Sequence, residues 1–144
     1  QADCRSSARR QDVKRIVIHN GDHARGNASN WKCRPSAAHY TIDRDGTTVS
    51  HVLPDQRAWH AGQSKMMGDR RPVNDFSIGF ELVNLKHGID SYPHTQIHAL
   101  RDLLRSLIAR YPIQYIVTHA EIADPPGRKS DPAGFDLNLI SDLL

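Results

Sequence analysis

The sequence contains two short apolar runs that each end in a histidine, and these runs constrain the fold more than any other feature. Ile16–His19 and Ile116–His119 are rich in β-branched residues, which is typical of buried strands. In α/β sheets, ligand sites gather at the carboxyl ends of the strands. We therefore expect His19 and His119 to converge on one metal ion. The alternative is that each is an ordinary histidine at the end of a strand.

The other patterns predict a mixed α/β fold. Asp45-Gly46 separates strand-like runs at 38–43 and 47–53, which is a hairpin signal, and a further strand is expected at 77–84. Apolar residues at helical spacing predict a long helix from Pro93 to Tyr111. Residues 135–144 predict a terminal helix capped by Asp136. Loops are expected at 20–35, 54–74 and 120–134. Because strands and helices do not alternate regularly, we expect a mixed central sheet flanked by helices.

A length of 144 residues indicates a single domain, with residues 1–14 as a polar arm and 15–144 as the folded unit. The net charge of +3 is mildly basic and specifies no nucleic-acid partner. No stretch approaches the roughly 18–20 apolar residues of a membrane span, and no signal peptide is expected in the polar start. We expect a monomer without a transmembrane segment.

Cys4 and Cys33 are the only cysteines, and neither belongs to a C-x-x-C motif, which argues against a thiolate zinc site. They either form a disulfide in an oxidising compartment or remain two thiols. Together with a start that reads as a processed N-terminus, they favour a periplasmic or secreted protein. The alternative compartment is the cytoplasm.

The loop that follows His119 contains Asp131, which can return a carboxylate to the point where the two histidines meet. Two histidines and one carboxylate, with a fourth position left for water, are the plan of a catalytic zinc site. A structural zinc site would instead have four protein ligands.

Six segments, taken in their order along residues 15–138, resemble the type 2 N-acetylmuramoyl-L-alanine amidases. This superfamily includes AmpD-type amidases, phage amidases and peptidoglycan recognition proteins. The segments are 16–20, 36–40 with 44–46, 57–62, 74–82, 118–119 and 127–132. The resemblance implies the amidase and recognition-protein fold, and hydrolysis of the amide bond between N-acetylmuramic acid and L-alanine in peptidoglycan or muropeptides.

The resemblance also implies the roles of the site residues. It assigns one Zn²⁺ per chain to His19, His119 and Asp131, which polarises the amide carbonyl and activates water. Glu81 matches the general base and proton donor of the AmpD-type branch. Lys129 matches a lysine that stabilises the oxyanion. Without the resemblance, Glu81 is a buried, paired carboxylate and Lys129 a solvated loop residue.

Five further residues are candidates for substrate binding. Asn20 follows a ligand, and Trp59 and His60 lie in a family motif. Trp59 either stacks on the sugar or packs in the core. Arg34 and Arg128 either pair with acidic groups of the substrate or are ordinary exposed arginines. Some relatives have a catalytic tyrosine where this chain has Ala38, a departure that favours Glu81.

Two other functions fit the same superfamily. A non-catalytic peptidoglycan-binding module is the main alternative, although such members typically lack a zinc ligand and all three positions are filled here. A regulator that acts through another protein is a further alternative. The sequence identifies no surface for such a partner.

Overall fold

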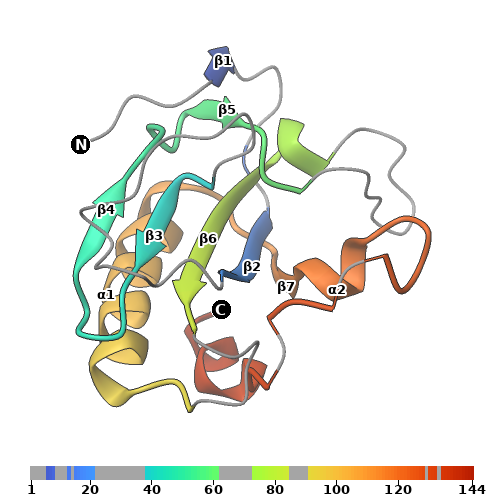
Figure 1. Ribbon diagram of the computed structural model, residues 1–144. Coiled ribbons are helices and arrows are strands. Elements are labelled where there is room, and N and C mark those ends of the chain that lie inside the picture. The colour runs from blue at the N-terminus through green and yellow to red at the C-terminus, as the bar shows by residue number, and fades with distance from the viewer. Residues whose placement is uncertain are drawn as a thin grey trace.

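A computed structural model describes residues 6–8, 13, 15–21, 38–61, 73–84, 91–128, 130–132 and 134–144, and leaves the side chains of 6, 8, 20, 21 and 75 undescribed. In this part of the chain, a five-stranded sheet has the order β4-β3-β6-β2-β7 (Figure 1). Its strands are β2 (Arg15–Gly21), β3 (Tyr40–Ile42), β4 (Thr48–Ser50), β6 (Ser77–Val83) and β7 (Tyr115–Thr118).

The sheet is mixed, as the sequence predicts. β3, β6, β2 and β7 pair in parallel, whereas β4 is antiparallel to β3. The β3–β4 turn is the predicted hairpin. Gly46 has φ +91°, a conformation that favours glycine, and its N–H donates to the Asp43 carbonyl.

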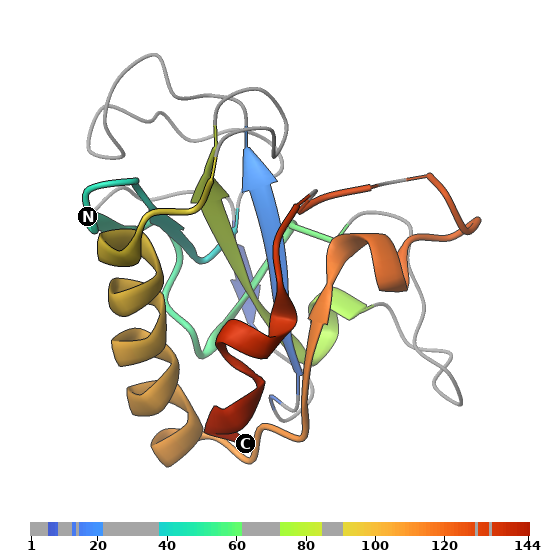
Figure 2. The same cartoon turned by 90° about the horizontal axis from the view of Figure 1, so that it is seen from below.

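Helix α1 (His94–Arg110) covers one face of the sheet, and the short helix α2 (His119–Ile122) lies on the other side (Figure 2). The prediction of a helix from Pro93 to Tyr111 is confirmed, since these two residues flank α1 as its caps. Within the described residues, no helix has both the length and the apolar character that a membrane span needs.

Alternate residues of the two central strands face two different cores, because side chains alternate across a strand. Ile16, Ile18, Ile78 and Phe80 pack with α1 in the larger cluster. On the opposite face, Val17 packs with Phe76, Val117 and Ile122. Strands buried on both faces are typical of parallel sheets, and this explains their nearly continuous apolar sequence.

Three expectations about local structure are wrong. The segment expected to be a terminal helix forms the 3₁₀ turns η4 (Leu137–Leu139) and η5 (Ser141–Leu143), although Asp136 does cap the first. Arg101 of α1 donates to the Leu139 carbonyl and to Asp142, so α1 binds this segment in a conformation other than an α-helix.

The second wrong expectation concerns the segment after β7, predicted as a loop, which begins with α2. Thr118 and Glu121 form a capping box there, each side chain accepting from the other residue's backbone N–H. The third concerns the predicted loop 54–74, which contains β5 (Gln56–Ala58) and the 3₁₀ turn η2 (Val73–Asp75). β5 pairs with β1 (Ser6–Ala8), so the arm carries a strand.

The α1 interface provides a test of the larger core. Leu104 is fully buried there, so Leu104→Ala is expected to lower the free energy of unfolding by about 2–5 kcal/mol. Leu139 is 41% exposed, and Leu139→Ala is expected to cost less than about 0.5 kcal/mol. Urea denaturation of the two variants measures both values. Equal losses would contradict the placement of α1 against the sheet.

Candidate functional site

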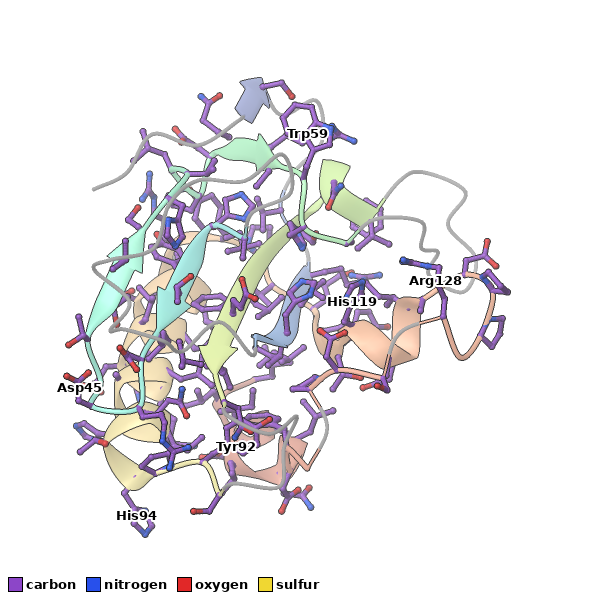
Figure 3. The ribbon with its side chains drawn as sticks, in the orientation of Figure 1. Asp45, Trp59, Tyr92, His94, His119 and Arg128 are labelled. Carbon is purple, nitrogen blue, oxygen red and sulfur yellow. The ribbon has the colours of Figure 1, made fainter. Side chains whose placement is uncertain are left out.

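The two predicted histidines lie side by side because β2 and β7 are parallel neighbours. Ile18 pairs with Thr118, so the next residue of each chain segment, His19 and His119, emerges at the same level. His19 is within β2, and His119 is the first residue of α2. Both are 6% exposed. His119 lies between β2 and α2 in Figure 3.

Asp131 reaches the same point through the backbone of α2. The N–H of Ala120 donates to the Asp131 carbonyl at 2.9 Å, which holds the returning loop against the start of the helix. The Thr118–Glu121 capping box fixes that helix start. The carboxylate of Asp131 thus lies beside His119, although 12 positions separate them in the sequence.

The three side chains form a compact cluster. The Nδ1 atoms of His19 and His119 are 3.0 Å apart, Asp131 Oδ1 is 3.0 Å from His119 Nδ1, and Asp131 Oδ2 is 3.4 Å from His19 Nδ1. Ligand atoms about 2.0–2.2 Å from a tetrahedral zinc ion lie roughly 3.3–3.6 Å from one another. The observed spacing is close to that of a tetrahedral ligand set.

The far nitrogen of His119 indicates which atom faces the cluster as an acceptor. Its Nε2 lies 2.8 Å from the Ala61 carbonyl oxygen, which can only accept a hydrogen bond. In the neutral ring Nε2 therefore carries the proton, and Nδ1 presents a lone pair toward Asp131. Since Asp131 also offers acceptor oxygens, this donor set fits a cation.

The electrostatics agree with an ionised carboxylate. Burial by itself would raise the pKa of Asp131, but the contacts with His119 and His19 outweigh burial and hold this pKa well below its usual range. This effect needs a proton on the ring nitrogens that face Asp131. In the neutral tautomer, where Nδ1 presents a lone pair, a bound cation would supply the positive charge instead.

Glu81 occupies the position of β6 that pairs with His19 of β2. Paired residues of adjacent strands project to the same face, so Glu81 stands beside the cluster. Its other neighbour in the sheet is Thr41 of β3, which is fully buried. Glu81 itself is partly exposed, unlike the two histidines.

The structure places three of the five predicted substrate residues. His60 is buried against the cluster, with Nδ1 3.1 Å from His19 Nε2. Arg128 donates to the Ala61 carbonyl at 3.1 Å, the same carbonyl that His119 contacts. Trp59 lies beside β5, away from His119 and Arg128 in Figure 3, with the Arg57 guanidinium 4.8 Å from its ring centroid.

The remaining predicted residues are outside the described part of the chain. These are Arg34, Lys129, Cys4, Cys33 and the side chain of Asn20.

Sequence reasoning missed the residues that hold the histidines. Asn74 accepts from the backbone N–H groups of His60, at 3.2 Å, and Ala61, at 2.9 Å, through its Oδ1 atom. The signal was weak because Asn74 lies in a short 3₁₀ turn 13 and 14 positions from its partners. No periodic pattern connects residues in that way.

The fold and the cluster together define a mixed α/β domain with a candidate metal centre of two histidines and one carboxylate, a ligand set found in zinc hydrolases. The sequence profile of the N-acetylmuramoyl-L-alanine amidase family matches residues 9–134. The chain therefore belongs to the N-acetylmuramoyl-L-alanine amidase family.

Individual relatives agree with this family. The chain is 45% identical over 108 residues to the 1,6-anhydro-N-acetylmuramyl-L-alanine amidase AmpD of Enterobacter cloacae, covering 72% of this chain and 54% of the relative. It is 34% identical over 138 residues to the N-acetylmuramoyl-L-alanine amidase AmiD of Escherichia coli, covering 83% of this chain and 49% of that protein. The chain thus spans about half the length of these curated relatives.

Solved structures share the fold. The crystal structure of an AmpD derivative aligns with a TM-score of 0.84 at 30% identity, covering 100% of this chain and 92% of that chain. A Drosophila PGRP-LB mutant in complex with tracheal cytotoxin aligns with a TM-score of 0.64 at 16% identity, covering 89% of this chain and 83% of that chain. The second similarity concerns the fold alone. The predicted fold class is confirmed.

The cluster makes a direct prediction about metal content. After dialysis against zinc and then zinc-free buffer, the wild-type protein is expected to retain about one zinc ion per chain, as a three-ligand site implies. His119→Ala removes a ligand and is expected to lose nearly all of this zinc. The control is His98→Ala on α1, where the imidazole is 77% exposed and contacts Asp102. Elemental analysis of the three proteins checks the prediction. Equal zinc in both variants would contradict the assignment.

Proposed function

We propose that this chain hydrolyses the amide bond between N-acetylmuramic acid and L-alanine in peptidoglycan fragments, with Zn²⁺ held by His19, His119 and Asp131. The observation that carries the proposal is the cluster of these three side chains, with both histidines buried, in a chain of the amidase family. A bound zinc ion supplies a Lewis acid that polarises the amide carbonyl and lowers the pKa of water.

Glu81 is the proposed general base. It takes a proton from the water whose oxygen attacks the amide carbon, and it then gives the proton to the leaving nitrogen of L-alanine. The carbon–nitrogen bond breaks, which yields a carboxylic acid on the sugar's lactyl group and a free peptide amine. The register of Glu81 beside His19 supports this role.

Lys129 is proposed to face the oxyanion that forms at the amide carbonyl, where a positive charge is most stabilising. Its position two residues before Asp131 in the sequence supports this assignment. Asn20, Arg34, Trp59 and Arg128 remain proposed substrate contacts. His60 was predicted with them, but its burial and its contact with His19 favour a role beside the metal site. The compartment also remains a prediction of the sequence, with a periplasmic or secreted location and the cytoplasm as its two alternatives.

A matched pair of variants tests the general base. Glu81→Gln keeps the shape of the side chain but removes the basic oxygen, so kcat is expected to fall by about 10²–10⁴-fold. Asp102→Asn removes a carboxylate from the exposed face of α1 and is expected to leave kcat unchanged. Release of free peptide amine from a muropeptide measures both rates.

The zinc content of Glu81→Gln separates a chemical role from loss of metal, since the variant is expected to keep its zinc. Full activity in Glu81→Gln would contradict the assignment of Glu81. Binding of muropeptides by a wild-type protein that releases no peptide would instead favour the non-catalytic binding module.

The form of the sugar gives a further test. The AmpD relatives are named for the 1,6-anhydro sugar, and they match this chain at up to 45% identity, so we propose soluble anhydro-muropeptides as the preferred substrate. The value of kcat/KM is expected to be at least about tenfold higher on anhydro-muropeptides than on matched reducing-end muropeptides, a difference of about 1.4 kcal/mol in transition-state binding. Equal values, or faster digestion of intact sacculi, would contradict this preference.

A further inference from the structure

His60 is a buried imidazole that connects a candidate ligand to the protein interior. It is 8% exposed, with Nδ1 3.1 Å from His19 Nε2 and Nε2 3.0 Å from the Ser77 hydroxyl oxygen. The Ser77 hydroxyl in turn lies 2.7 Å from the Val73 carbonyl oxygen. These contacts form a chain of hydrogen bonds from the backbone at Val73 to the ring of His19.

The direction of every bond in this chain follows from its inner end. A carbonyl oxygen only accepts, so the single hydroxyl proton of Ser77 points to Val73. The Ser77 oxygen therefore accepts from Nε2–H of His60. In the neutral ring of His60 the other nitrogen, Nδ1, is then an acceptor. It receives a hydrogen bond from His19 Nε2–H.

The last bond sets the tautomer of His19. With its proton on Nε2, the ring presents the lone pair of Nδ1 to His119 and Asp131. Metal-binding histidines depend on such partners, which fix the ring orientation and raise the basicity of the ligating nitrogen. We propose that His60 is a positioning residue of the metal site, which holds His19 as the Nε2–H tautomer through the Ser77–Val73 chain. This inference rests on the proposed function.

His60 can serve this purpose because its own position is tightly defined. Asn74 binds the backbone N–H of His60, as it does that of Ala61. A Cβ atom at Gly79 would lie 2.5 Å from the Cγ and Nδ1 atoms of His60, so a side chain at Gly79 would displace the ring. Gly79 thus provides the space for His60 on β6.

The adjacent residue serves the second histidine. The Ala61 carbonyl accepts from His119 Nε2–H, whereas His60 contacts His19. Two consecutive residues, His60 and Ala61, thus orient His19 and His119, respectively. A displacement of this segment would disturb both histidines together. Asn74 holds this segment in place, because its Oδ1 atom accepts from the backbone N–H groups of both His60 and Ala61.

The test compares the zinc affinity of variants that change residues of this hydrogen-bond chain. His60→Phe keeps a ring but removes the acceptor for His19, and we expect the Kd for Zn²⁺, measured by competition with a chelator, to rise about 10–100-fold. His60→Asn keeps an oxygen near the place of Nδ1 and is expected to recover at least half of this loss on a logarithmic scale. The control is His51→Phe. It removes another buried imidazole, which contacts Thr41 and takes no part in the hydrogen-bond chain of His60, and it is expected to change the Kd for Zn²⁺ less than about twofold.

A second readout is specific for the hydrogen bond. In the zinc-loaded wild-type protein the Nε2–H proton of His19 is expected to exchange slowly with water in NMR spectra, because it is buried and bound to His60. In His60→Phe this protection is expected to disappear, while the core amide protons stay protected. A purely structural role of His60 would not change the His19 proton selectively.

Ser77→Ala tests the inner part of the chain. It is expected to weaken zinc binding in the wild-type background and to have no further effect in His60→Phe, since both changes break the same connection. If Ser77→Ala and His60→Phe weakened zinc binding by independent, additive amounts, the proposed hydrogen-bond chain would be contradicted.

Unchanged zinc affinity and unchanged His19 protection in His60→Phe would overturn the positioning role and leave the proposed function standing. A wild-type protein that binds no zinc would overturn both.

Discussion

The parallel pairing of β2 with a neighbour on each side is the contact on which the site depends. β7 brings His119 level with His19, and β6 places Glu81 at the position paired with His19. The same register places Val17 opposite Gly79, in the row that contains His19 and Glu81. Because side chains alternate across a strand, a shift of one residue would turn this row toward α1. The two apolar cores fix the register of the strands, and this register determines which side chains meet at the site.

The imidazoles near the cluster are linked by hydrogen bonds to backbone carbonyl groups. His119 contacts the Ala61 carbonyl, and His60 leads from His19 toward the Val73 carbonyl through Ser77. Buried polar groups are costly when they lack partners, so such connections also stabilise the domain. The family membership and the cluster both agree with the proposed zinc-dependent hydrolysis, the first through the whole sequence and the second through a few interatomic distances.

Much of the architecture follows from local pattern. The apolar runs predict the central strands, Asp45-Gly46 predicts the hairpin, and the helical spacing of apolar residues predicts α1. The prediction of a terminal α-helix is wrong. Arg101 of α1 binds the Leu139 carbonyl and the Asp142 carboxylate of that segment, contacts that local periodicity does not contain. Helix α2 could have been predicted from the sequence, since Thr118 and Glu121 have the spacing of a capping box.

The sequence by itself determined the identity of the central elements and, through the order of its motifs, the family and the three side chains of the candidate metal cluster. These features are local, or depend only on order along the chain. The tertiary structure decided which atoms meet. His19 and His119 are 100 positions apart, and His19 and His60 are 41 apart. The placement of a proton on one ring nitrogen depends on contacts a few ångströms long between such distant segments, and no pattern along the chain encodes those distances.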